Sequence, residues 1–150
     1  MSTHYRGTKQ ERLALDLYIK LSRAAETVST HVNQHLHAQG LTISQFGVLE
    51  ALYHLGAMSP GQLCEKILRS TGNMTLVIDN LEKRGLVRRV QNPEDRRSVI
   101  VELTAVGNQL ITSIFPAHVA TVVQEMQILT EAEQIELARL CRKLGLQQDA

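Results

Sequence analysis

Apolar residues recur at helical spacing from Lys9 to Gln39. They form one track of Leu13, Leu17, Leu21, Ala24, Val28, Val32 and Leu36, and a second of Leu15, Tyr18, Ile19 and Ala25. Steps of three and four residues predict an α-helix with apolar residues on more than one face. A helix of about 30 residues is about 45 Å long, longer than the core of so small a chain. We therefore expect part of it to pack against a second chain; one wide stripe buried within the chain is the alternative.

Three short helices are predicted next, over about residues 42–56, 59–68 and 70–85. Two of them begin with the spacing of a capping box, Thr42 with Gln45 and Ser59 with Gln62. The third begins at Ser70 or Thr71 and has an inner stripe of Met74, Val77, Ile78 and Leu81. Glycines stop the first and third of these helices, and Gly85 suits the left-handed residue that follows a helix.

The period then changes to that of extended chain. Residues 86–90 and 99–103 predict two strands, and the turn residues 92–95 between them predict a hairpin. A long helix is expected from Thr104 to about Ile128, kinked or broken at Pro116. Thr130 with Glu133 opens a last helix that should stop at Gly145.

The order of these elements is that of a winged helix-turn-helix. We therefore predict a mainly α fold in one domain, 1–150. A DNA-binding lobe over 42–103 would be flanked by dimerisation helices over 9–39 and 104–145.

The composition is that of an ordinary soluble protein. The chain has 150 residues, of which 43% are hydrophobic and 21% charged, and it is long enough to bury a core without a disulfide or a structural metal. Cys64 and Cys141 lack ligand spacing and fit a reducing compartment. The polar start and the absence of about 18 consecutive apolar residues predict a cytoplasmic protein that does not enter a membrane. No cofactor is expected.

The charge is unevenly distributed along the chain. The net charge is +1, yet residues 66–97 hold eight Lys or Arg against four Asp or Glu, and the rest of the chain is mildly acidic. A local positive patch of this kind suits a polyanion. Aromatic residues make up only 3%, which disfavours stacking on single-stranded nucleic acid.

The outward face of the third short helix carries small polar and basic residues. Helical spacing from the inner stripe places Gly72, Asn73, Leu76, Asp79, Asn80 and Lys83 there, with Ser70 and Thr71 at the front and Arg84 at the back. A helix fits the major groove of DNA, where the base edges are distinguishable, and its N-terminus suits a phosphate. The alternative is a merely solvated face.

The hairpin tip presents Asp95, Arg96 and Arg97. An arginine on such a tip can enter the narrow, electronegative minor groove. Asp95 stands two residues before Arg97 and can hold its guanidinium through a bidentate ion pair. A solvated charged tip is equally compatible with this segment alone, and the neighbouring helix favours DNA.

The segment from Ser70 to Thr104 resembles the signature of the MarR family of dimeric bacterial transcription regulators. The matching positions are Thr75, Asp79, Leu81-Glu82, Gly85-Leu86-Val87, Asp95-x-Arg97, Leu103-Thr104 and Gly107. The resemblance implies a winged-helix homodimer, usually a repressor, that a small ligand or oxidation releases from a pseudo-palindromic operator. It places Arg97 in the minor groove with Asp95 as its orienting partner. It places Ser70 to Asn73, Thr75 and Leu76 at the major groove.

Leu76 and Asn80 depart from the family pattern, which often has basic or larger polar residues there. The departure leaves the operator sequence and the number of phosphate contacts open. An exposed leucine could instead contact a thymine methyl group.

The effector is predicted by elimination and resemblance. Thiol-sensing relatives carry a cysteine near the start of the first helix, which this chain lacks, and Cys64 and Cys141 lie beside apolar stripes that favour burial. His31, His35 and His37 could approach a zinc geometry, without a supporting carboxylate or cysteine. The stretch Phe115-Pro116-Ala117-His118 resembles a subgroup that responds to quinones and phenols. We therefore expect an aromatic or phenolic ligand where the long helices meet the DNA-binding lobe, with Tyr18, Arg23, His54 and His118 as polar candidates.

Two other classes of protein compete with this interpretation. An enzyme is disfavoured because the chain shows no phosphate loop, nucleophile elbow or paired catalytic carboxylates. The alternative that the chain forms a helical dimer that binds a protein partner is compatible with the sequence. A DNA-binding affinity that falls steeply with salt concentration would distinguish the two functions.

Overall fold

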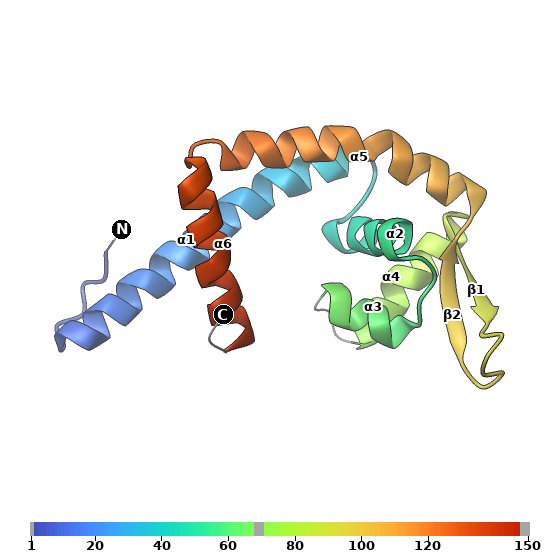
Figure 1. Ribbon diagram of the computed structural model, residues 1–150, viewed down its shortest axis with the longest axis horizontal. Helices are drawn as coiled ribbons and strands as arrows, with labels where there is room; N and C mark the ends of the chain where they lie inside the picture. Colours follow the sequence, from blue (N-terminus) through green and yellow to red (C-terminus); the bar gives the residue numbers. More distant parts are fainter. Residues whose placement is uncertain (1, 68–70, 148–150) are drawn as a thin grey trace. The chain divides into compact units, whose positions relative to one another are not determined.

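The structure is a computed structural model that describes residues 2–67 and 71–147 (Figure 1). Its elements are α1 (Lys9–Ala38), α2 (Ile43–Leu55), α3 (Pro60–Ile67), α4 (Thr71–Lys83), β1 (Val87–Gln91), β2 (Val99–Leu103), α5 (Ala105–Met126) and α6 (Glu131–Leu146). The mainly helical fold with one small hairpin is therefore confirmed, in the predicted order.

The chain divides into two compact units. The first, here called the helical unit, consists of Met1–His31 and Val119–Ala150; the second, here called the lobe, is Val32–His118. The lobe thus takes in the end of α1 and the beginning of α5 besides the predicted segment 42–103. It contains the helix-turn-helix elements and the hairpin.

The core of the lobe is built from helices whose starts the sequence specifies locally. The Thr42 hydroxyl accepts from the Gln45 backbone N–H, and the Gln45 side chain accepts from the Thr42 N–H, both at 3.1 Å. Ser59 and Gln62 make the same reciprocal pair. Both predicted capping boxes are confirmed. The largest fully buried side chains, all from the lobe, are Leu36, Leu41, Val48, Leu49, Leu63, Met74, Ile78, Leu81, Val87, Val101 and Ile111.

The hairpin, here called the wing, is an antiparallel pair in which Val87 faces Leu103 and Gln91 faces Val99. A third segment joins it, because Met58 and Val101 exchange two backbone hydrogen bonds of 3.1 and 2.8 Å. The loop between α2 and α3 is thereby tied to β2. The sequence did not indicate this contact, which joins residues far apart in the chain.

Two helix predictions need correction in detail. Helix α5 does not break at Pro116, and Ile111 and Ile114 remain buried in the lobe; a kink at Pro116 stays a prediction. Helix α6 continues past Gly145 to Leu146, and Gln147 adopts the left-handed conformation that follows it. A glycine inside a helix costs only about 1 kcal/mol.

Apolar side chains remain exposed on the helical unit. They lie on α1, the end of α5, the α5–α6 connection and α6, and include Leu13, Leu17, Tyr18, Val123, Ile128, Ile135, Leu137, Leu140 and Leu144. Helix α5 is also long and apolar enough to cross a membrane, a property that it shares with core helices of soluble proteins.

Candidate nucleic-acid interface

Helix α4 has one buried and one exposed face. Met74, Ile78 and Leu81 are completely buried, which fixes the rotation of the helix in the lobe. On the opposite side Asn73 and Lys83 are exposed, and Leu76 retains 61% of its accessible surface. An isolated leucine this exposed on a packed helix is available to a partner.

The remaining predicted residues of this helix are placed as follows. Thr71 is the first residue of α4 and Gly72 the second, whereas Ser70 lies outside the described residues. Thr75 is exposed and Asn80 is half-buried. The structure therefore brings the described candidates together on one helix.

Arg84 has an intramolecular partner that the sequence did not reveal. Its Nη1 donates a 2.7 Å hydrogen bond to the carbonyl oxygen of Gly40, just beyond the end of α1. A guanidinium near the C-terminus of a helix is favoured by the helix dipole. Arg84 therefore has a structural role in the lobe that competes with its predicted contact to DNA.

The tip of the wing is held by hydrogen bonds to its backbone, from other backbone groups and from side chains. Asn92 donates its backbone N–H to the Ser98 carbonyl at 3.0 Å, and Gln91 Nε2 donates to the Arg96 carbonyl at 2.7 Å. The Asp95 carboxylate accepts from the backbone N–H of Arg97 at 3.0 Å.

The predicted Asp95–Arg97 ion pair is not formed between these two described side chains, because the carboxylate caps the backbone of the turn instead. Arg96 and Arg97 are both exposed.

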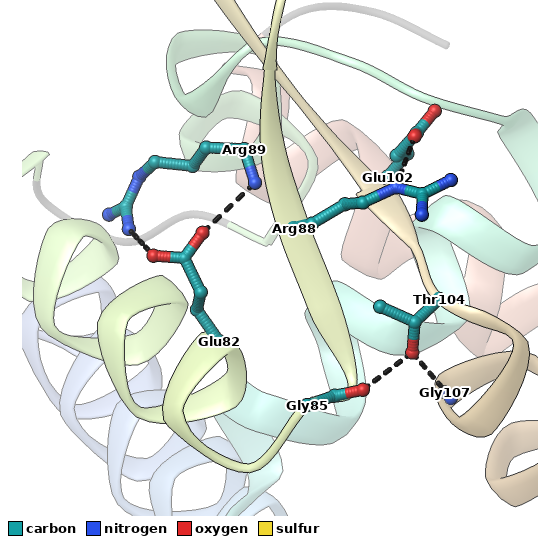
Figure 2. A network of polar contacts seen from close by, with 7 residues as sticks. All are labelled: Glu82, Gly85, Arg88, Arg89, Glu102, Thr104 and Gly107. Atoms are coloured by element: carbon teal, nitrogen blue, oxygen red, sulfur yellow. Dashed lines mark hydrogen bonds and ion pairs between the residues drawn. The ribbon is translucent and has the colours of Figure 1, made fainter.

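A polar network joins the base of the wing to its surroundings (Figure 2). Arg89 contacts both Asp79 and Glu82 of α4, at 2.6 and 3.0 Å. Arg88, its neighbour on β1, points to the other side and pairs with Glu102 on β2 at 2.6 Å. Neither arginine has a partner nearby in the sequence that would indicate these pairs; the alternation of side chains along a strand places the two on opposite sides.

Thr104 and Gly107 complete this network at the start of α5. The Thr104 hydroxyl donates to the Gly85 carbonyl at 2.6 Å and accepts from the Gly107 N–H at 3.0 Å (Figure 2). Gly85 itself has φ of +70°, so the predicted left-handed residue after α4 is confirmed. The end of α4, the wing and the start of α5 therefore meet at Thr104.

Aromatic rings and imidazoles gather elsewhere in the lobe. The centroid of the His118 ring lies 4.2 Å from that of Phe46 and 6.2 Å from that of His35. The His54 and Phe115 rings meet edge-on, with their centroids 4.9 Å apart. Burial lowers the pKa of His118 below its ordinary value, His35 lowers it further, and Glu50 opposes the shift. Nε2 of His35 and Nδ1 of His118 are buried and have no hydrogen-bond partner among the residues that the structure describes.

The four candidate effector residues belong to different units. His54 and His118 lie in this aromatic group of the lobe, whereas Tyr18 and Arg23 lie on the part of α1 that belongs to the helical unit. Tyr18 is 69% exposed. The contact of all four with one ligand stays a prediction.

The thiols and histidines do not form a metal site in the described residues. No group of three or more His, Cys, Asp or Glu that could hold an ion occurs within 2–67 and 71–147. His31 instead pairs with Glu125 at 2.8 Å. Cys64 is half-buried and Cys141 is exposed, so the expected burial of Cys141 was wrong, because the apolar face of α6 is itself uncovered in this chain.

Comparisons with known proteins agree with this geometry. The sequence model of the MarR family matches residues 41–99. The HTH-type transcriptional regulator MhqR of Bacillus subtilis (strain 168) is 38% identical over 133 residues, covering 89% of this chain and 92% of that protein.

Two solved structures extend the comparison. BpsR of Bordetella bronchiseptica, whose DNA binding is regulated by 6-hydroxynicotinic acid, superposes with a TM-score of 0.77 at 29% identity, covering 86% of this chain and 98% of that one. Sco3205 of Streptomyces coelicolor, a MarR family regulator solved in complex with DNA, gives a TM-score of 0.83 at 23% identity, covering 95% and 90%. The latter similarity shows the fold.

Proposed function

Because this chain belongs to the MarR family of DNA-binding transcriptional regulators, which are not enzymes, we propose that it is a homodimeric repressor. Each protomer would insert α4 into the major groove and the wing tip into the adjacent minor groove. Two half-sites about 34–36 Å apart would then form a pseudo-palindromic operator. As a regulator of transcription it would act in the cytoplasm.

One observation carries the proposal: the exposed side of α4 and the exposed arginines of the wing tip belong to the same compact lobe. Asn73 and Leu76 supply a hydrogen-bonding and an apolar contact for base edges, and Lys83 supplies a positive charge for a phosphate. Arg97 has an exposed guanidinium, which suits the electronegative minor groove. The remaining proposed contacts are Ser70, Thr71, Gly72, Thr75, Asn80, Arg84 and Arg96, with Asp95 shaping the tip.

The dimer is supported by the helical unit. Monomeric soluble proteins rarely leave large apolar patches exposed, yet α1 and α6 expose leucines along their length, among them Leu17 at 60% and Leu140 at 45%. We propose that a second copy covers them. The double variant Leu17→Glu with Leu140→Glu should sediment as a monomer, and a variant that stays dimeric would contradict this assignment.

The effector is proposed to be a small aromatic acid or phenol. A relative of 29% identity has its DNA binding regulated by 6-hydroxynicotinic acid, a hydroxylated aromatic ring. This chain places His54 beside Phe115 and His118 beside Phe46, rings that suit an aromatic ligand. Tyr18 and Arg23 are further proposed contacts. Response to a thiol oxidant or a metal is the alternative.

The proposal is tested by binding to the DNA that flanks the protein's own gene. A gel-shift titration should show a specific complex at low salt, and Arg97→Ala should weaken it by roughly fivefold or more. Arg139→Ala removes the same charge from α6 of the helical unit and serves as the control, with circular dichroism to verify folding. If Arg97→Ala bound the operator as tightly as the wild type, the proposed contact of the wing with the minor groove would be refuted.

The effector is tested in the same assay. Hydroxybenzoic acids and hydroquinones should dissociate the complex in a concentration-dependent manner, whereas cyclohexanecarboxylic acid, which lacks the aromatic ring, should not. Release by diamide or by zinc, and not by any aromatic compound, would favour the alternative effectors.

A further inference from the structure

Arg89 of β1 is bonded to two carboxylates of α4. Its Nη2 lies 2.6 Å from Asp79 Oδ1 and its Nη1 lies 3.0 Å from Glu82 Oε1. Asp79 and Glu82 are three residues apart, so both stand on one side of the helix. The guanidinium therefore spans two points of α4 at once, which fixes an orientation as a single ion pair does not.

The backbone of Arg89 adds a third contact. Arg89 faces Val101 across the hairpin, and Val101 directs both its N–H and its carbonyl oxygen to Met58. The Arg89–Val101 pair is thus of the type that is not hydrogen-bonded, and the Arg89 N–H points away from β2. Glu82 Oε2 accepts this N–H at 3.0 Å. Side chain and backbone of one residue are both attached to α4.

The attachment of Arg89 to α4 affects the wing tip, because a small rotation at the base of the hairpin displaces the tip by a larger distance. Asp95, near the tip, lies six positions after Arg89 and beyond the end of β1 at Gln91, so it lies at most about 20 Å away. A rotation of about 10° at Arg89 would then displace the tip by up to about 3.5 Å, a shift comparable with the length of a hydrogen bond. When α4 is bound in the major groove, the angle between α4 and the wing therefore determines whether the tip reaches the minor groove.

We propose that Arg89 is a positioning residue for DNA binding, one that sets the angle between α4 and the wing through Asp79 and Glu82 and does not itself contact DNA. This inference rests on the proposed DNA-binding function. It also accounts in part for two carboxylates on a helix that approaches a polyanion, since Arg89 offsets one of their two negative charges.

Replacing the two carboxylates gives the most direct test. Bulk electrostatics and a positioning role of Arg89 predict opposite changes in DNA affinity. Asp79→Asn with Glu82→Gln makes the protein more positive, so bulk electrostatics alone would tighten binding to DNA. If Arg89 positions the wing, the same double variant should weaken operator binding by about fivefold to tenfold. It should also lose the minor-groove protections in a hydroxyl-radical footprint and retain the major-groove protections made by α4.

Arg88→Gln is the matched control for Arg89→Gln. Both remove one charge from adjacent positions of β1, but Arg88 pairs with Glu102 within the hairpin and does not touch α4 in the described contacts. We expect a loss of about tenfold for Arg89→Gln, with an altered footprint, and of twofold or less for Arg88→Gln, with an unaltered one. Arg89→Lys keeps the positive charge but lacks the planar guanidinium that contacts both carboxylates. Its operator affinity should lie between those of Arg89→Gln and the wild type.

The outcomes separate this inference from the proposed function. If the wild-type protein fails to bind its promoter at low salt, DNA binding itself is refuted. If it binds, and the Asp79→Asn, Glu82→Gln variant binds as tightly or more tightly with the wing footprint intact, the positioning role alone is refuted. Equal losses for Arg89→Gln and Arg88→Gln would likewise refute it.

Discussion

The carboxylate of Asp95 accepts a 3.0 Å hydrogen bond from the backbone N–H of Arg97, and the Arg97 side chain is left exposed. The aspartate therefore shapes the turn and presents the arginine, without binding its guanidinium. In this role the oxygen acceptor matters and the negative charge does not.

Substitution of Asp95 separates these two properties. Asp95→Asn keeps an oxygen that can accept the Arg97 N–H, so operator affinity should stay within about twofold of wild type or increase. Asp95→Ala removes the acceptor and should weaken binding by about fivefold, corresponding to the roughly 1 kcal/mol of one hydrogen bond. Fluorescence anisotropy with a labelled operator measures both; an Asn variant as weak as the Ala variant would restore the ion-pair interpretation.

Leu76 should contact a thymine methyl group. Replacing the contacted thymine by uracil should weaken wild-type binding by about fourfold, the equivalent of roughly 0.8 kcal/mol for one buried methyl group. The same replacement should leave Leu76→Ala unaffected, so that the double-mutant cycle shows coupling. Leu55→Ala, a leucine of α2 with nearly the same exposure (60% against 61%), is the control. If uracil scanning across the operator never affects the wild-type protein, Leu76 has another role.

Gly107 cannot carry a side chain. A Cβ at this position would overlap the carbonyl oxygen of Leu86, and that oxygen is held in place by the Thr104 N–H at 3.1 Å. Gly107→Ala should lower the free energy of unfolding by about 2 kcal/mol or more.

The matched control is Gly145→Ala, also in a helix but with open space around the added Cβ; it should raise stability by about 0.5–1 kcal/mol. Urea denaturation at one fixed protein concentration compares the two variants. Unchanged stability of Gly107→Ala would mean that the joint between β1 and α5 is pliable.

The stability of the lobe should depend on pH through His118. Burial and the neighbouring His35 lower the pKa of His118 in the folded protein, against a smaller raising effect of Glu50, whereas the unfolded chain keeps the ordinary value near about 6.5. Between these two pKa values the unfolded chain binds more protons, so the free energy of unfolding falls as the pH drops below about 6.5.

His118→Phe removes the titrating group and should flatten this part of the pH profile, measured by denaturation between pH 7 and 5. His37→Gln, which replaces an exposed histidine of α1, should retain the wild-type profile. A His118→Phe profile as steep as that of the wild type would assign the pH dependence to other groups.

The boundaries of most elements could be predicted because their signals are local. The capping pair Thr42–Gln45 and the left-handed Gly85 are each determined within a few residues of sequence. The change from a period of three to four residues to a period of two likewise identified the wing. Signals of this range need no knowledge of the rest of the fold.

The contacts that position the candidate site could not be predicted in the same way. Arg84 reaches Gly40 and Met58 pairs with Val101 across more than forty residues of sequence, and nothing in either local sequence specifies the partner. A break at Pro116 and a stop at Gly145 were wrong, because the continuing helix outweighs the intrinsic cost of either residue. The sequence alone indicates only the positive charge of Arg89. Its partners Asp79 and Glu82 are brought to it by the packing of α4 against β1.

The central claim is that two copies bind one operator through cationic side chains. Within the described residues, Lys83, Arg96 and Arg97 make no ion pair inside the protein, so a dimer offers roughly six cationic contacts to DNA. The logarithm of the binding constant should then fall with the logarithm of salt concentration with a slope of about −5. Native mass spectrometry should find two chains per duplex. A single chain per duplex, or a slope near zero, would contradict the account.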